Sequence, residues 1–111
     1  MTVMFCAFDG PPLILRLYGT AKAVHKGDPK WNEHFSLFKA FPGARQIFDV
    51  TLDLVQPPCG MGAPYFSYAG DREPLSDWAT QKGEAGLQQY WQDKNQVSID
   101  NIPTYIVAKS G

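Results

Sequence analysis

Two runs of β-forming residues on either side of a compact turn constrain the fold more than any other feature. Residues 2–8 are short, apolar and rich in β formers, and residues 13–24 show the alternation that is typical of a strand. Residues 9–12, Asp-Gly-Pro-Pro, favour a turn, because glycine tolerates unusual φ values and proline lacks an amide donor. The sequence therefore predicts an antiparallel hairpin.

An arginine lies in the middle of the second predicted strand. Arg16 falls between Leu15 and Leu17, and alternation places its side chain on the opposite face from both. Such an arginine either packs its stem and directs its charge into solvent, or contacts an anion such as a phosphate. Both interpretations stay open. Gly19, in the same strand, suits a bulge or a bend.

The rest of the chain combines one more long strand with helices. The expected elements are a short amphipathic helix over 31–41, a long strand over 45–56, a short strand over 64–69, a helix from Pro74 to near Gly83, a second helical stretch over 84–93, and a final short strand in the tail.

This order of elements predicts a single domain over residues 1–111, mainly β with α, in the α+β class. A β-barrel needs more strands than these, with matched tilt and stagger, before it can close. A partner chain or further sequence must therefore cover the open strand edges.

Charge and cysteine content exclude several function classes. Ten basic residues are scattered among eleven acidic ones, for a net charge of −1, so no basic patch predicts binding to nucleic acid or to a membrane surface. No apolar run approaches the roughly 20 residues of a membrane span, and no signal peptide is recognisable. Cys6 and Cys59 form no metal-binding or disulfide pattern. We expect a cytoplasmic protein with free thiols and no metal.

Hydrolytic and phosphate-loop chemistry also lack a signal. His25 and His34 have no carboxylate or cysteine at ligand spacing, so packing or solvated roles are favoured for both. The serines lie outside any Gly-x-Ser-x-Gly elbow, and no Gly-x-Gly-x-x-Gly or Walker loop occurs. The sequence assigns no catalytic residue.

The segment that most resembles a binding site is Cys59-Gly60-Met61-Gly62. Two glycines let the backbone approach a ligand closely, and the N–H groups can point at carbonyls or anions. A plain turn explains the same residues. Composition leaves both interpretations open.

Several segments follow one another in an order that is known from a family. They are residues 3–12 with 15–21, residues 42–46, residues 59–64, Gly70-Asp71-Arg72 with Trp78, and the tail 95–103. In this order they resemble the pyridoxamine 5'-phosphate oxidase-related family of FMN-binding flavoproteins. The resemblance covers nearly the whole chain, and the ordered set is more specific than any single motif.

The resemblance implies a split β-barrel of antiparallel strands with a short inserted helix and helices near the C-terminus, incomplete in one chain. It implies a homodimer that holds FMN between its subunits and performs two-electron redox on a small-molecule substrate, which the sequence does not identify. By the same carry-over, Arg16 lies on a strand that borders the flavin. Cys59, Gly60, Met61 and Gly62 fall where the partner subunit's loop approaches it.

The chain departs from the family in three places. The N-terminal barrel strands, which carry much of the usual FMN phosphate contact, are expected to be missing before Met1. Pro58 replaces a common serine, and Asn101 replaces a usual glycine, a smaller change because asparagine tolerates left-handed backbone.

Three hypotheses follow. The first is an FMN-dependent oxidoreductase. The second is a truncated, non-catalytic split-barrel module that acts in self-association or small-ligand binding. The third is that Met1 is an internal start within a longer working protein.

Overall fold

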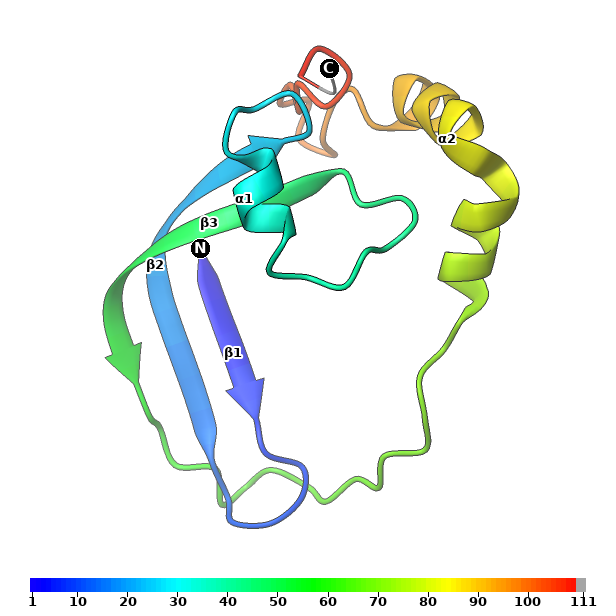
Figure 1. Cartoon of the computed structure of the whole chain (residues 1–111). Coiled ribbons are helices and arrows are strands. Elements are labelled where there is room, and N and C mark those ends of the chain that lie inside the picture. The colour runs from blue at the N-terminus through cyan, green and yellow to red at the C-terminus, as the bar shows by residue number, and fades with distance from the viewer. Residues whose placement is uncertain (110–111) are drawn as a thin grey trace. The chain divides into compact units, whose positions relative to one another are not determined.

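The computed structural model describes residues 1–109. In chain order they form β1 (Thr2–Cys6), β2 (Ile14–His25), α1 (Trp31–Phe35), β3 (Gln46–Gln56) and α2 (Pro74–Lys94). The three strands make one antiparallel sheet, in which β2 lies between β1 and β3 (Figure 1). The α+β prediction is confirmed. Across the described residues the sheet does not close into a barrel.

The predicted hairpin is confirmed by the register of its strands. β1 pairs antiparallel with β2, with Thr2 opposite Tyr18 and Cys6 opposite Ile14. Between the strands, Gly10 adopts a φ of 70°, which residues with a Cβ atom rarely tolerate. The turn therefore needs its glycine for conformation.

The described chain divides into two compact units. The first contains Met1–Lys22 and Asp49–Asp71, and the second contains Ala23–Phe48 and the chain from Arg72 onward. β2 and β3 each pass from one unit into the other. The expectation of a single domain stays a prediction.

The first unit consists of β1, the larger parts of β2 and β3, and the loops over 7–13 and 57–71, and it contains none of the buried apolar residues found among residues 1–109. Met4 and Phe5, which point to opposite faces of β1, are 58% and 56% exposed. On β3, Leu52 and Leu54 share the face that alternation assigns to a core, yet they are 48% and 55% exposed. The sequence pattern of a buried face is thus present, but no described segment covers that face.

The second unit contains the hydrophobic core. Its buried cluster is made of Ala79, Leu87, Trp91 and Ile106, against which Trp78 packs. Burial of two indoles and three aliphatic side chains is the main apolar stabilisation of this unit, since the transfer free energy scales with the apolar area removed from water. α2 is therefore held by its core contacts.

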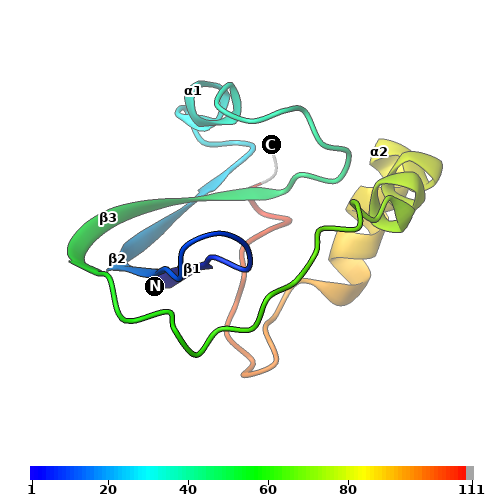
Figure 2. The ribbon, with the colours of Figure 1, turned by 90° about the horizontal axis from the view of Figure 1, so that it is seen from below.

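The two helical stretches that the sequence predicts on either side of Gly83 are joined in α2 across a kink. Pro74 lies in its first turn, where the missing amide is not needed. At Gly83 the backbone leaves helical geometry, with a φ of 65° and a ψ of 173°, so that the two helical stretches run in different directions (Figure 2). None of the helices in the described chain is both long and apolar enough to cross a membrane.

Of the predicted elements, one helix is shorter than expected and one strand does not form. The helix predicted over 31–41 ends at Phe35, because the following Leu37 and Phe38 are exposed and give no packing to extend so short a helix. No strand forms over 64–69, where Phe66 instead hydrogen-bonds to the Phe8 carbonyl and packs edge-on against its ring. In place of the final strand expected in the tail, residues 95–109 contain an isolated bridge between Val97 and Pro103.

Candidate functional site

Arg16 lies in the middle of β2, directly opposite Met4 of β1. Its side chain is half-buried, and it forms no hydrogen bond or ion pair with any other residue in the range 1–109. Tyr18, two residues along the same face, donates from its hydroxyl to Oε1 of Gln56 at 3.3 Å. The guanidinium of Arg16 is therefore a cation whose donors remain available to an anion.

The segment 59–62 is attached to the hairpin turn. Cys59 forms a β-bridge with Leu13, and Gly60 is buried against it: a Cβ added to Gly60 would lie 2.7 Å from the Leu13 nitrogen. Gly60 is therefore required for close packing within its own chain, and ligand approach is not needed to explain it. Both Cys59 and Cys6 are free thiols.

The second half of this segment is open. The Gly60 carbonyl accepts from the Ala63 amide at 2.9 Å, which makes residues 60–63 a β-turn. Within the described chain, the central amides of that turn, on Met61 and Gly62, have no hydrogen-bond acceptor. Two adjacent outward N–H groups can donate to a carbonyl or an anion.

A shallow hollow lies beside this turn, with a volume of about 160 Å³. It is lined by Ala7, Gly10, Pro12, Gly60, Met61, Ala63 and Tyr65. Sites that enclose small molecules usually measure roughly 300–1,000 Å³. The hollow is too small to enclose a flavin ring, so a second surface would have to complete such a site.

Arg16 and the turn amides do not converge within one chain. Cys59 is adjacent to Leu13, three residues along the chain from Arg16, which corresponds to about 10 Å of strand. An odd spacing also places Leu13 and Arg16 on opposite faces. The five sequence-predicted site residues thus form two separate contact points.

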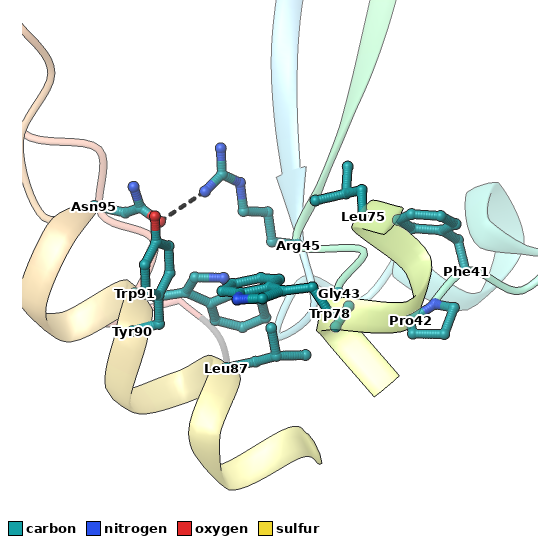
Figure 3. A pocket seen from close by; sticks show the side chains of 11 residues that line it. Phe41, Pro42, Gly43, Arg45, Leu75, Trp78, Leu87, Tyr90, Trp91 and Asn95 are labelled. Carbon is teal, nitrogen blue, oxygen red and sulfur yellow. Dashed lines mark hydrogen bonds between the residues drawn. The ribbon is translucent and has the colours of Figure 1, made fainter. Parts of the chain in front are cut away.

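A larger cavity, of about 480 Å³, lies in the second unit (Figure 3). Its lining comes from the turn before β3 and from one side of α2: Phe41, Pro42, Gly43, Arg45, Leu75, Trp78, Ala79, Leu87, Tyr90, Trp91 and Asn95. The turn requires Gly43 for its φ of 84°, whereas an added Cβ would meet Ala79 at 3.4 Å, an ordinary contact distance. Trp78 and Tyr90 meet edge-to-face at 5.1 Å.

Among residues 1–109, Arg45 is the only charged residue that lines this cavity. Its Nη1 donates to Oδ1 of Asn95 at 2.7 Å, across 50 residues of sequence (Figure 3). Asn95 is itself held at the end of α2, where its amide donates to the Trp91 carbonyl at 2.9 Å. Sequence reasoning missed this site, because Arg45 only flanks a turn and nothing local connects it to Asn95.

His25 corrects one detail of the sequence expectations. It is buried, which agrees with a packing role, but Asp28 lies beside it, with 3.7 Å between Nδ1 and Oδ2. The same Oδ2 accepts from the His25 amide at 2.7 Å, and Nε2 of His25 lies 2.9 Å from Nε2 of Gln46. The cluster anchors the end of β2 to the start of β3.

Comparison with known proteins gives one informative relative. A pyridoxamine 5'-phosphate oxidase family protein, ustO of Aspergillus flavus, is 29% identical over 119 aligned positions that cover 92% of this chain. The chain is a distant homologue of that protein. The aligned part of this chain spans about half of that protein's length, 47%. The family resemblance is thereby confirmed. No family model and no solved structure matches the chain.

Proposed function

We propose that this protein is an FMN-binding flavoprotein of the pyridoxamine 5'-phosphate oxidase-related type, with a split-barrel fold completed by strands beyond those described. The proposal extends to an oxidoreductase that carries out two-electron redox on a small molecule. The observation that carries it is the homology over 92% of the chain to a protein of that family name. Location in the cytoplasm stays a prediction.

The first unit offers contacts that fit FMN. The half-buried Arg16, with no partner among residues 1–109, suits the phosphate or another electron-rich edge of the cofactor. The amides of Met61 and Gly62 suit a carbonyl oxygen of the ring. When bound, FMN supplies the hydride-accepting ring, and the role of these residues is to bind and orient it.

Homodimerisation explains how separated contacts could serve one cofactor. Arg16 lies about 10 Å along the strand from Leu13, to which Cys59 is bridged, and the hollow beside the turn measures only about 160 Å³. In a dimer, Arg16 of one copy and the turn of the other could border the same flavin. The exposed apolar sheet of the first unit supplies surface for such an interface.

The test is flavin uptake by the purified chain. We expect the protein to take up added FMN, seen as a shifted visible flavin spectrum and a change in flavin fluorescence. Arg16→Gln should weaken FMN binding roughly tenfold or more, the usual effect of losing a hydrogen bond to a charged group. Arg72→Gln is the matched control, because Arg72 is exposed and lies outside the first unit.

A second pair of variants tests the turn amides. Met61→Pro removes one N–H at a turn position that favours proline, while Met61→Ala keeps the N–H and removes the same exposed side chain. Only the proline variant should weaken FMN binding. Colourless protein that takes up no FMN, while its circular dichroism shows a folded chain, would contradict the cofactor proposal.

A non-catalytic, self-associating module is the second candidate, and the uncovered sheet favours it. Unit 1 contributes no buried apolar residue among those described, so its folding must be stabilised by another surface. Sedimentation at micromolar concentration should detect a dimer in the absence of FMN. A cooperatively folded monomer under those conditions would contradict self-association.

A further inference from the structure

The aromatic cavity of the second unit is independent of the proposed flavin contacts. Its residues all belong to the second unit, whereas Arg16 and the turn over 60–63 belong to the first. We propose that this cavity binds a small planar carboxylate, and that Arg45 holds the carboxylate group. The ligand class is an aromatic or similarly flat monocarboxylate.

The size and walls of the cavity suit a flat apolar body. About 480 Å³ falls within the range of sites that enclose small molecules, roughly 300–1,000 Å³. Trp78, Tyr90 and Trp91 present ring surfaces to it, and Leu87 and Phe41 add apolar contact (Figure 3). Aromatic rings pack edge-to-face or offset against another flat ring.

The charge around the cavity selects an anion. Arg45 lines it, and within the described part of the chain no aspartate or glutamate does. The ammonium groups of Lys82 and Lys26 also lie 5.7 and 5.6 Å from the ring centroids of Trp78 and Trp91. Glu84 lines an adjoining hollow together with Lys26, and it does not line the cavity itself.

The arginine is positioned before any ligand arrives. Its hydrogen bond to Asn95 uses one donor of the guanidinium and leaves four of five. The backbone of Asn95 is fixed in turn by two hydrogen bonds. Its amide donates to the Trp91 carbonyl, and its carbonyl accepts from the Thr104 hydroxyl at 2.5 Å. A preset guanidinium loses less side-chain freedom on binding, and its planar fork matches a carboxylate.

The experiment uses the full chain and two probes of equal shape. Calorimetric titration compares 2-naphthoate with 2-naphthamide, which has the same ring system but no negative charge. We expect the wild-type chain to bind 2-naphthoate at least tenfold more tightly than 2-naphthamide, because only the carboxylate forms charge-assisted hydrogen bonds with Arg45. Equal affinities, or no binding of either probe, would overturn the proposal.

Variants then assign the effect to one residue. Arg45→Gln should weaken 2-naphthoate binding roughly ten- to a hundredfold and leave 2-naphthamide binding unchanged. Arg45→Lys keeps the charge but not the fork, and it should show an intermediate loss. Arg72→Gln should bind both probes as the wild type does. If Arg45 only ties the turn to α2, Arg45→Gln will keep the preference for naphthoate, and the assignment fails.

Competition separates this site from the flavin proposal. Added FMN should leave 2-naphthoate binding unchanged, and Arg16→Gln should do the same, since Arg16 belongs to the other unit. Displacement of 2-naphthoate by FMN would show that the cavity is a flavin site, and it would overturn the assignment to a small carboxylate. Failure of FMN to bind at all leaves the carboxylate test intact.

Discussion

Gly19 of β2 lies close against the backbone of β3 at Thr51, and its replacement by alanine is a sharp test of the sheet. An added Cβ would sit 2.2 Å from the Thr51 carbonyl oxygen and 2.9 Å from its carbon, with Val50 Cγ1 at 3.0 Å. Real Cβ contacts are essentially never shorter than 3.0 Å, so the two strands would have to separate by nearly an ångström. The obstacle is backbone, which cannot rotate away as a side chain does.

The expected magnitude follows from two opposing terms. Replacing glycine with alanine stabilises a fold by about 0.4–1 kcal/mol through the unfolded chain, provided that the native backbone accepts it. Overpacking in a rigid site costs about 1–3 kcal/mol, and a backbone clash lies at the upper end. Gly19→Ala should therefore lower the free energy of unfolding by about 2–2.6 kcal/mol net.

Thermal unfolding followed by circular dichroism measures this effect, at one fixed protein concentration because self-association would shift the midpoint. A loss of 1 kcal/mol corresponds to a drop of roughly 4 °C in a domain of this size. Gly62→Ala is the matched control, since its added Cβ meets nothing within 4 Å, and its midpoint should stay near that of the wild type. A Gly19→Ala midpoint equal to or above that of the control would refute the close pairing of β2 with β3.

Three further expectations concern stability and proton binding. Gly86→Ala should raise the free energy of unfolding by about 0.5–1 kcal/mol in chemical denaturation, because an added Cβ meets only Lys82 side-chain atoms at ordinary contact distance within α2. Asn101→Gly should also stabilise, by a few tenths of a kcal/mol in the same assay, because Asn101 holds a φ of 59°. The hydrogen bond to Asp71 raises the pKa of the Tyr68 hydroxyl above its ordinary 10.0. This hydrogen bond stabilises the fold at pH values below 10.0, and its contribution is lost as the pH rises through the raised pKa of Tyr68. Asp71→Asn should lower that pKa, and NMR titration of the tyrosine ring can follow the change.

Local features of the chain were predictable because local rules decide them. The hairpin follows from β-forming runs around residues 9–12, and the kink in α2 follows from Gly83 between two apolar stripes. The helix over 31–41 was predicted too long because aromatic spacing indicates a helix only where something packs against the aromatic side chains. Phe38 is 58% exposed, so burial of its ring contributes little to holding a further helical turn.

The two candidate sites differ in what a sequence can reveal. Arg16 and the segment 59–62 were found because each is unusual within a few residues of its own position. The hydrogen bond between Arg45 and Asn95 was not found, because it joins residues 50 positions apart through the packing of a turn on a helix. The tryptophans and tyrosine of α2 were visible as an apolar stripe, but a stripe alone predicts core and does not predict a cavity.

The distribution of buried residues explains why these sites should depend differently on other chains. The cavity around Arg45 is built on the cluster of Ala79, Leu87 and Trp91, which the second unit buries by itself. Its ligand should therefore bind whatever the oligomeric state. The contacts around Arg16 lie on a sheet with half-exposed apolar side chains on both faces, so their geometry becomes fixed only when another surface covers that sheet. Flavin binding should accordingly rise with protein concentration, while carboxylate binding should not.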